Sequence, residues 1–400
     1  MAAWPTKRMD ELCEITSSKR IFAADYVSEG VPFYRGREIT EKYKGNLDVS
    51  TELFITEEKF QQIERKFGAP RQGDLLLTSV GTLGSVYVVK PGDRFYFKDG
   101  NLTWFRHFKE LDSQFLYYWL GSPQGKAELQ KCTIGSSQSA FTIVLLKSME
   151  IKLPPTPIQR RIAGILSSYD ELIENSQRRI KILESMARAL YRQALEMGKE
   201  PVILRPIVES PYWRFISENV SDYHGTKRYF ATADIDGLAV TGSGIDYSFA
   251  EKPSRAQKQP IPKSVWFARM KETYKIAWYG PLEDERVSGI VLSSGFAGFE
   301  AKDEELWPLL FLTISSREFH LQKDLYCTGA TQMSLTNEGM ARIVLPMPDE
   351  QSARRLGRTA GPMLNAIAVL QRQHENLRRT RDLLLPRLLF GHIDVESFAS

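Results

Sequence analysis

The chain has 400 residues, of which 42% are hydrophobic and 26% are charged, as in ordinary globular proteins. It contains no apolar run near the roughly 18 residues that suggest a membrane span, and residues 1–7 lack a signal-peptide pattern. Cys13, Cys132 and Cys327 form no CxxC pair, which argues against a disulfide framework or zinc site and predicts a reducing cytoplasm. Because the net charge is only +4, any polyanion must be bound by local basic patches.

One plan occurs twice in the sequence, about 194 residues apart. The first copy contains Gly135-Ser136-Ser137-Gln138, Lys152-Leu153-Pro154 and Arg160-Arg161-Ile162. The second copy contains Gly329-Ala330-Thr331-Gln332, Val344-Leu345-Pro346 and Arg354-Arg355-Leu356. Since solenoid units have only about 20 to 50 residues, this period predicts two whole domains, each followed by a helical arm. The predicted boundaries are residues 1–155 for the first domain, 156–200 for the first helix, 201–348 for the second domain and 349–395 for the second helix.

The first domain begins with Trp4 and a basic pair, Lys19-Arg20, and then has candidate strands at residues 32–39 and 73–78. The counterparts in the second domain are Trp213, Lys227-Arg228, residues 229–235 and residues 263–270. Short runs of apolar and aromatic residues between turn formers predict mixed α+β domains. We interpret Cys132 and Cys327, which precede the two Gly-x-x-Gln motifs, as shared packing residues.

The first long helix has a clear predicted start, with Thr156 as N-cap, Pro157 at the first helical position and Gln159 completing a capping box. It should end near Gly198. Seven-residue spacing predicts a coiled-coil seam with polar interruptions at Ser176 and Arg179. The seam residues are Ile162, Ile165, Tyr169, Leu172, Leu183, Met186 and Leu190. The apolar flank of Ile173, Ile180, Ala187 and Ala194 predicts contact with a further helix or a partner subunit.

The second helix should begin at Asp349, be interrupted by Pro386 and close at Gly391. Its predicted seam is Leu356, Met363, Leu370, Leu377 and Leu384, with Ile367 beside them. Each arm would span on the order of 50 to 60 Å, and neither could bury its stripe alone. We therefore expect an antiparallel pair that places the domains at opposite ends of a rod; a homodimer with parallel coils is the alternative. The arginines Arg178, Arg179, Arg188, Arg378, Arg379 and Arg381 form either a solvated face or a contact surface for DNA or a partner.

The order of these motifs resembles the specificity (S) subunit of bacterial type I restriction-modification systems. The resemblance rests on Gly-x-x-Gln, Leu-Pro, Gln-x-x-Arg-(Ile/Leu) and a long helix, all repeated, and on the ending Leu384-Leu385-Pro386-Arg387-Leu388-Leu389-Phe390-Gly391-His392-Ile393. Gly73-Asp74-Leu75-Leu76-Leu77-Thr78 and Phe267-Ala268-Arg269-Met270-Lys271 also match sequences common in the target recognition domains of that family. The second copy keeps the family's Glu-Gln at Glu350-Gln351, whereas the first has Ile158-Gln159.

This resemblance implies a non-catalytic DNA-binding subunit in a bacterial or archaeal cytoplasm. Two target recognition domains would each bind half of an asymmetric site in double-stranded DNA, and an antiparallel coiled coil would act as a ruler for the unread spacer. The coil would dock methylation (M) subunits, expected to be two, and restriction (R) subunits would join the complex. The resemblance implies no cofactor in this chain, with S-adenosylmethionine, ATP and Mg in the partner subunits, and no membrane partner.

Motifs for chemistry are missing from the sequence. No Asn/Asp-Pro-Pro-aromatic motif or phosphate-binding loop occurs, and the five histidines are scattered singly, which predicts no metal site. Ser294-Gly295-Phe296-Ala297-Gly298 is interpreted as a turn after a strand at Val291-Leu292. A self-sufficient methyltransferase or nuclease is therefore disfavoured, while a two-headed coiled-coil scaffold that binds proteins stays open as an alternative.

Candidate DNA-binding residues are cations, amides and hydroxyls on loops, because Arg and Lys suit guanine and phosphate, and Asn and Gln suit adenine. In the first domain they are Lys19, Arg20, Arg35, Arg37, Ser79, Thr82, Lys98 and Asn101. In the second domain they are Lys227, Arg228, Lys258, Arg269, Lys271, Ser293 and Ser294. Gln138 and Gln332 occupy equivalent loops, where we expect a structural role, such as capping the helix or tying the loop to the coil, with direct DNA contact as the alternative.

Overall fold

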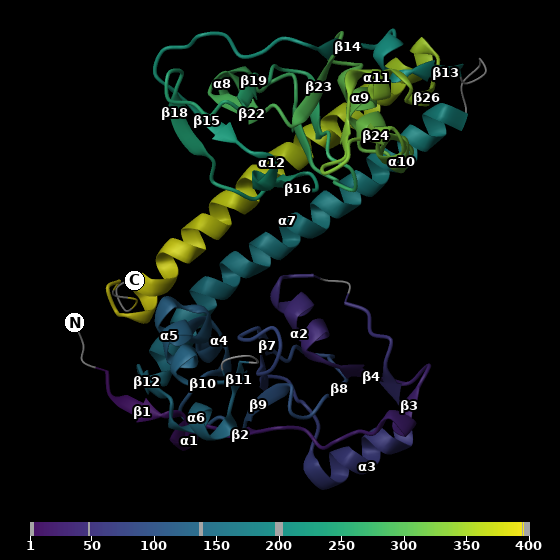
Figure 1. The fold of residues 1–400 in the computed structure, drawn as a ribbon. Helices are drawn as coiled ribbons and strands as arrows, with labels where there is room; N and C mark the ends of the chain where they lie inside the picture. The colour runs from purple at the N-terminus through teal and green to yellow at the C-terminus, as the bar shows by residue number, and fades with distance from the viewer. Residues whose placement is uncertain (1–3, 47–48, 136–138, 197–202, 394, 396–400) are drawn as a thin grey trace. The chain divides into compact units, whose positions relative to one another are not determined.

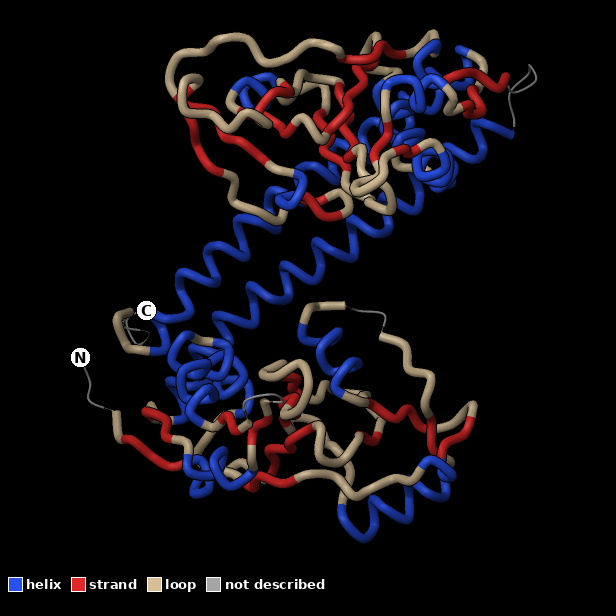
Figure 2. Tube along the Cα trace, viewed as in Figure 1, coloured by secondary structure: helices blue, strands red, loops and turns tan. Residues whose placement is uncertain are grey.

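The computed structural model describes residues 4–46, 49–135, 139–196, 203–393 and 395 (Figure 1). The chain divides into two compact units: unit 1 consists of residues 1–175 and 375–400, and unit 2 of residues 176–374. Helices and strands are mixed in both units (Figure 2), which confirms the predicted α+β class. Within the described residues, no helix is long and apolar enough to cross a membrane.

Unit 1 is built on two four-stranded sheets. The first sheet has the order β2-β9-β6-β7 and is antiparallel; its strands are β2 (Glu14–Thr16), β9 (Leu102–Arg106), β6 (Leu75–Thr78) and β7 (Val86–Val88). The second sheet has the order β3-β5-β4-β8; its strands are β3 (Tyr26–Val27), β5 (Phe54–Ile55), β4 (Val31–Tyr34) and β8 (Tyr96–Phe97). The pair β4 and β8 is parallel, so the two strands end at the same edge.

Short ribbons and helices complete unit 1. The ribbons are β1 (Thr6–Arg8) with β12 (Glu150–Lys152) and β10 (Thr133–Ile134) with β11 (Ala140–Phe141). The short helices are α1 (Met9–Leu12), η1 (Ala23–Asp25), α2 (Gly36–Tyr43), α3 (Glu57–Phe67), α4 (Ser113–Gly121), α5 (Pro123–Lys131) and α6 (Ile143–Ser148). The largest core of the unit joins the first sheet to α4, where Phe105 and Phe115 are fully buried.

Unit 2 repeats the antiparallel sheet of unit 1 and the parallel strand pair of its second sheet. Its antiparallel sheet has the order β14-β23-β20-β21 and consists of β14 (Trp213–Ile216), β23 (Phe296–Ala301), β20 (Ser264–Ala268) and β21 (Ile276–Tyr279). The other four-stranded sheet has the order β18-β15-β22-β19 and consists of β18 (Ile245–Ser248), β15 (Thr226–Phe230), β22 (Ile290–Ser293) and β19 (Ala256–Lys258). Strands β15 and β22 are parallel, as β4 and β8 are in unit 1. The duplication predicted from the motifs is therefore present in the sheets as well.

Ribbons and short helices complete unit 2 in the same way. The ribbons are β13 (Ile203–Pro206) with β26 (Val344–Met347), β24 (Cys327–Thr328) with β25 (Ser334–Leu335), and β16 (Ile235–Asp236) with β17 (Ala239–Val240). The short helices are η2 (Ile207–Glu209), η3 (Thr232–Asp234), α8 (Asp284–Ser288), α9 (Trp307–Ile314), α10 (Arg317–Leu325) and α11 (Asn337–Ala341). Every residue of α9 is buried, and this explains why all of them except Thr313 are apolar.

Two long helices, α7 (Thr156–Glu196) and α12 (Glu350–Leu389), each contribute to both units. In unit 1, Ile162 and Leu166 of α7 share a core with Leu388 and Leu389 at the other end of α12. In unit 2, the later part of α7 packs on the beginning of α12, and Ala187 and Tyr191 join the core that contains Leu356. Within each unit, the start of one helix thus meets the end of the other, which confirms the antiparallel pairing.

The predicted seam is correct on α12 but partly wrong on α7. On α12, Leu356 and Leu370 are buried, and Met363, Leu377 and Leu384 are half-buried. On α7, Ile162 is buried and Ile165, Tyr169, Leu183 and Leu190 are half-buried, whereas Leu172 and Met186 are 54% and 47% exposed. The buried stripe of α7 instead includes Ile173 and Ala187, which were expected on the flank. A straight α-helix drifts by about 20° per heptad, so strict seven-residue spacing leaves the contact face over a long helix.

Three further details of the helices differ from expectation or sharpen it. Asp349 caps α12 as predicted, because its carboxylate accepts from the Ser352 N–H at 2.9 Å. Pro386 does not interrupt α12, which continues to Leu389; the missing N–H falls near the last turn, and the burial of Leu388 and Leu389 holds that turn in place. The end at Gly391 is confirmed, since this residue has φ 65°.

The hydrogen bonds of the two units show that several pairs of residues predicted to be equivalent are not. The Phe141 N–H donates to the Ser79 carbonyl at 3.0 Å, and the Leu335 N–H donates to the Arg269 carbonyl at 2.9 Å, so Ser79 and Arg269 occupy the same place. The ribbons pair Thr133 with Phe141 and Cys327 with Leu335. Cys132 is therefore one position out of register with Cys327, and the prediction that they match is wrong.

The opening landmarks of the two domains are not equivalent either. Trp213 lies in β14, which corresponds to β2, whereas Trp4 precedes β1. Residues 32–39, predicted as a strand, divide between β4 and α2, because Glu38 accepts from the Arg35 N–H at 2.8 Å and starts the helix. Residues 73–78 and 263–270 do contain the predicted strands, β6 and β20.

Candidate nucleic-acid interface

Three strand ends meet at one edge of unit 1 and bring several predicted residues together. The Lys98 N–H donates to the Tyr34 carbonyl at 2.9 Å, which places the end of β8 beside the end of β4. The Ser79 N–H donates to the Asn101 carbonyl at 2.8 Å, which places the end of β6 beside the turn after β8. The start of α2 at Arg35 and the loops that begin at Ser79 and Lys98 therefore share this edge.

Two of the cations at this edge share one buried acid. The Arg35 and Arg37 guanidinium groups lie 3.0 and 3.2 Å from Oε1 of Glu38, whose side chain is fully buried. Burial alone raises the pKa of Glu38, but hydrogen bonds from the Arg35 side chain and from backbone N–H groups outweigh it and hold this pKa below its usual range. Arg37 keeps 57% of its side chain exposed, so it stays accessible to a ligand while Glu38 fixes its position.

The remaining candidates of unit 1 divide by exposure. Lys98 and Thr82 are exposed, and Asn101 is half-buried. Lys19 and Arg20 are exposed, with the ammonium of Lys19 4.7 Å from the Phe67 ring centre and the Arg20 guanidinium 5.6 Å from that of Phe22. The exposed side chains among them are accessible to a polyanion.

Two serines on the candidate list are buried and cannot contact a ligand from their places. Ser79 is 2% exposed, and its hydroxyl lies 2.7 Å from that of Thr103. Ser293 is 3% exposed, and its hydroxyl accepts from the Gly295 N–H at 3.2 Å. The prediction of DNA contact is wrong for both side chains, since a hydroxyl at a buried strand end forms its hydrogen bonds inside the domain.

In unit 2, Arg269 occupies the place of Ser79 and lines a groove of about 790 Å³. Its guanidinium donates to the Leu335 carbonyl at 3.1 Å and to Oδ1 of Asn337 at 3.0 Å. Burial lowers the pKa of Arg269 from its ordinary value. Arg342 lies in the same groove, so two cations face one open hollow.

Lys271 and Ser294 flank Arg269. The ammonium of Lys271 lies 3.8 Å from the Met333 sulfur, and the side chain is half-buried. The Arg269 N–H donates to the Gly295 carbonyl at 2.9 Å, which brings the turn at Ser294 beside the end of β20. The interpretation of residues 294–298 as a turn after a strand is correct for residues 294 and 295 and wrong for residues 296–298, which begin β23.

Lys227 and Arg228 lie on β15, which corresponds to β4, so they match Val31-Pro32 rather than Lys19-Arg20. Arg228 forms a two-bond ion pair with the carboxylate of Asp246 at 2.8 Å. Lys227 donates to Oε1 of Gln259 at 2.7 Å, and burial lowers its pKa. The equivalence predicted for the two basic pairs is wrong, because adjacent cations carry no information on strand position.

Lys258 lies on β19, beside β22. Its ammonium donates to Oδ1 of Asn219 at 2.9 Å and to the Ser217 carbonyl at 3.3 Å. Burial first, and the charge of Arg269 second, lower the pKa of Lys258. The structure thus gathers Lys258, Arg269 and Ser294 at one place.

The Gly-x-x-Gln motif forms the tip of the β24–β25 hairpin. Gly329 has φ 130°, and a Cβ there would lie 2.6 Å from the Gln332 carbonyl oxygen, so the turn requires glycine. The exposed side chain of Gln332 points its amide toward the Met270 sulfur at 3.6 Å and neither caps a helix nor ties the loop to the coil, so the expected structural roles are wrong. Gln138, its counterpart, lies outside the described residues.

The Gln-containing motif is repeated at the starts of α7 and α12, but different side chains join the two helices to the neighbouring loops. Gln159 is fully buried: its amide donates to the carbonyls of Pro154 and Glu110 at 2.7 and 2.9 Å, and its oxygen accepts from the Asp112 N–H at 2.8 Å. This corrects the predicted capping box, because Gln159 holds the loop before α4 instead of the N-cap. At α12, Ala353 occupies the place of Gln159 and Gln351 is exposed.

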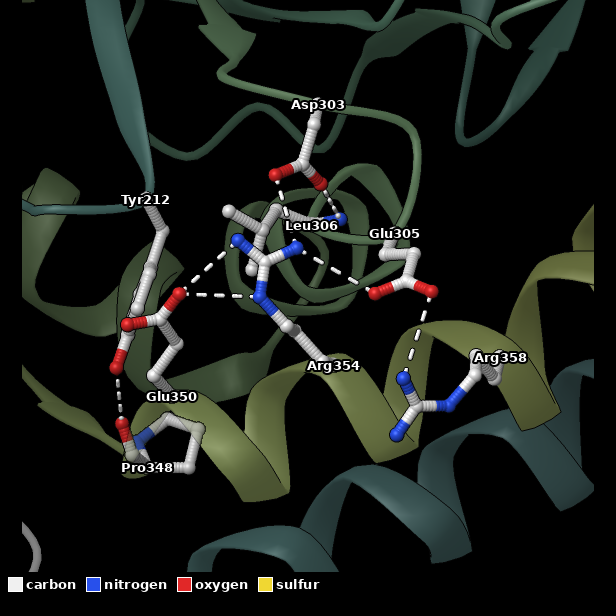
Figure 3. Close-up of polar contacts among 8 residues, drawn as sticks. All are labelled: Tyr212, Asp303, Glu305, Leu306, Pro348, Glu350, Arg354 and Arg358. Atoms are coloured by element: carbon white, nitrogen blue, oxygen red, sulfur yellow. Dashed lines mark hydrogen bonds and ion pairs between the residues drawn. The ribbon is translucent and has the colours of Figure 1, made fainter.

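Figure 3 shows what replaces Gln159 in unit 2. Tyr212 donates its hydroxyl to the Pro348 carbonyl at 2.7 Å, as Gln159 donates to Pro154. Arg354 lies between Glu350, Asp303 and Glu305, at 3.0, 3.0 and 3.4 Å, and Arg358 lies 3.4 Å from Glu305. In unit 1, the Gln159 amide therefore joins α7 to the loop before α4. In unit 2, the ion pairs of Arg354 join α12 to the loop before α9.

Residues 1–185 match the family model of the type I restriction modification DNA specificity domain. Curated specificity subunits match nearly the whole chain as well: that of the type I restriction enzyme MjaIX from Methanocaldococcus jannaschii is 24% identical over 98% of this chain and 94% of its own length. Over nearly its whole length, the chain is therefore similar to type I restriction-modification specificity subunits.

A putative type I restriction enzyme specificity subunit from Haemophilus influenzae is 29% identical over 175 residues, so the match spans 42% of that relative and 40% of this chain. Among solved structures, the type I restriction-modification S subunit from M. genitalium has a TM-score of 0.62 at 16% identity and covers 96% of both chains. That likeness shows a shared fold over both repeats of the chain.

Several residues of the candidate interface were not predicted from the sequence. Asn337 and Arg342 line the groove of Arg269, and Glu38 holds two cations in unit 1. A signal for Glu38 was present in the sequence: an acid three residues after Arg35 is the pattern of a capping carboxylate, and Asp234 repeats it by accepting from the Ala231 N–H at 2.7 Å. Within the described residues, no group of three or more His, Cys, Asp or Glu could hold a metal ion.

Proposed function

We propose that this chain is the DNA-sequence reader of a type I restriction-modification complex and that each target recognition domain binds one half of an asymmetric site. One observation carries the proposal: the two units share the antiparallel sheet, a parallel strand pair and their hydrogen-bonded frame, but their strand ends bear different polar groups. Arg269 replaces Ser79, and Ala231 replaces Arg35. A common frame with unlike side chains suits the recognition of two different base sequences.

The contact chemistry supports DNA as the ligand. Cations that follow strands, such as the exposed Arg37 and Lys98 and the half-buried Lys271, can pair with phosphates or with guanine in the major groove. In this assignment, the arginines held by Glu38 and by Asn337 are the better candidates for base contacts, because these partners fix the direction of each guanidinium.

The helices α7 and α12 serve in this proposal as the ruler that sets the unread spacer and as the dock for two methylation subunits, with restriction subunits joining the full complex. The recognition domains are residues 1–155 and 201–348, and the coil comprises residues 156–200 and 349–395. The chain itself is non-catalytic, and S-adenosylmethionine, ATP and Mg belong to the partner subunits.

Genome-wide mapping of methylated positions in cells with and without this gene tests the proposal. The expected result is one bipartite, asymmetric methylated motif that disappears with the gene. Gel-shift assays with duplexes that carry this motif, with and without the methylation subunit, provide the binding measurement. No sequence-selective shift in either condition would overturn the proposal in favour of a protein-binding scaffold, and methylation by the purified chain alone would contradict its non-catalytic part.

A further inference from the structure

Two loops of equal length occupy the same place in the two units. Residues 80–85 connect β6 to β7, and residues 270–275 connect β20 to β21. Their frames match, because the Thr78 N–H donates to the Ser85 carbonyl at 2.9 Å and the Ala268 N–H donates to the Lys275 carbonyl at 3.0 Å. Each loop follows directly on a candidate contact residue at the end of the central strand.

The two loops differ in which positions adopt positive φ and in the residues found there. In unit 1, Gly81 and Gly84 have φ 81° and 84°, a conformation that glycine adopts without strain. The loop of unit 2 contains no glycine, and Glu272 has φ 57°. A non-glycine residue in the left-handed region is strained and persists only where its surroundings hold it.

A buried lysine and its neighbour hold this strained loop. Lys323 of α10 is fully buried, and its ammonium lies 2.7 Å from the Met270 carbonyl, 3.0 Å from the Thr273 carbonyl and 3.0 Å from Oδ1 of Asp324. The same Asp324 oxygen accepts from the Glu272 N–H at 3.0 Å. The ammonium therefore donates to two loop carbonyls and forms an ion pair with Asp324, and both sides of the strained residue are held by α10.

The frame itself does not require a lysine at this position. Helices α5 and α10 begin in the same way, since Ser122 accepts from the Gly125 N–H and Ser316 from the Phe319 N–H, both at 3.1 Å. Counted from these caps, Leu129 occupies the place of Lys323, and it is 3% exposed. The unit with glycines in the loop thus has leucine there, and the unit without them has lysine.

We propose that Lys323, together with Asp324, is a positioning residue for DNA recognition: it fixes residues 269–273 so that Arg269 and Lys271 face one half-site in a single geometry. This inference rests on the proposed function. Lys323 touches no ligand itself and acts through the backbone of the loop. The contacts of Lys271 with Met333 and of Met270 with Gln332 extend the fixed geometry to the β24–β25 hairpin.

The test measures binding of the full chain with its methylation subunit to duplexes with single base changes in each half-site. Lys323→Leu, the residue that unit 1 uses, should lower base discrimination about tenfold in one half-site and leave the other half-site unchanged. Glu272→Gly added to Lys323→Leu should restore most of the discrimination, because glycine adopts the loop conformation unaided. Arg317→Leu, which removes an exposed cation from the same helix, is the matched control and should change nothing.

Amide exchange of residues 270–273 in the free protein gives a second measurement that does not need DNA. It should become faster in Lys323→Leu and in Asp324→Ala, and the latter serves if the lysine variant does not fold. Unchanged exchange, intact discrimination in a folded variant, or equal loss in both half-sites would overturn the inference. A wild-type complex without sequence selectivity would instead overturn the proposed function, while the exchange measurement would still decide whether Lys323 holds the loop.

Discussion

Arg381 of α12 lies 2.6 Å from Asp170 of α7, and the same aspartate accepts a 2.6 Å hydrogen bond from the hydroxyl of Tyr118. Both charged side chains are about three-quarters buried, with 27% and 30% exposure. Arg381 therefore does not belong to a solvated arginine face, as one reading of the sequence had it. It joins the two long helices and α4 within unit 1.

Replacement of Arg381 by methionine should lower the free energy of unfolding by about 1 to 3 kcal/mol, because Asp170 keeps its charge in a half-buried place and loses its counter-ion. Denaturation by urea measures this loss. Arg379→Met, which changes an exposed neighbour on α12, should cost less than about 0.5 kcal/mol. In a double-mutant cycle with Asp170→Asn, the two changes should not be additive; simple additivity would refute a direct pair.

Gln159→Ala should destabilise the protein by about 2 to 3 kcal/mol, since it leaves buried backbone groups at Asp112 and Pro154 without their partner. The repeat supplies the control: Gln351 belongs to the same family motif in the second copy but is exposed. Gln351→Ala should stay within about 0.5 kcal/mol of the wild type. Equal effects of the two substitutions in thermal or urea unfolding would show that the motif, and not the local contact, sets the stability.

The stability of unit 2 should fall in mild acid because of His320. Burial, aided by the charge of Lys323, lowers the pKa of His320 to about 4, whereas histidine in an unfolded chain titrates near 6.5. Below about pH 6.5, His320 therefore binds a proton in the unfolded chain but not in the native state. The free energy of unfolding decreases as the pH falls from about 6.5 toward 4, and it is constant above about 6.5 as far as His320 is concerned. The loss has a ceiling of about 3 kcal/mol.

His320→Phe should flatten this dependence in urea denaturation at pH 4.5 and pH 7.5, because phenylalanine can keep the ring contacts with Tyr274 and Phe319. His107→Phe is the matched control: that ring is 69% exposed and sits beside Glu14. A wild-type profile that is flat between these pH values would contradict the depressed pKa.

One heptad inserted after Asn175 in α7, together with one inserted before Glu375 in α12, should lengthen the unread spacer by about three base pairs and leave both half-sites unchanged. Seven helical residues add about 10 Å, and each base pair of DNA rises about 3.4 Å. Methylation mapping measures the new spacer. The same seven residues placed after Gly92, in an exposed turn, should leave it unchanged. An unaltered spacer in the helix variant would refute the ruler.

The repeat, the two long helices and the α+β class follow from the sequence because they depend on local signals: capping residues, turn formers and seven-residue spacing. Asp349 and Gly391 mark the limits of α12 as expected. The resemblance to specificity subunits follows from the order of short motifs. These features need no knowledge of what any residue meets across the fold.

Only the tertiary structure decided which side chains are accessible and which are equivalent. The strand pairing makes β15 the counterpart of β4, so Lys227 has no basic pair as its equivalent in unit 1. Packing at strand ends buries Ser79 and Ser293. Lys323 looks like a surface cation in the sequence, yet its ammonium is fully buried against the Met270 loop. Such outcomes arise from contacts between residues far apart in the chain, and no periodicity or local propensity records them.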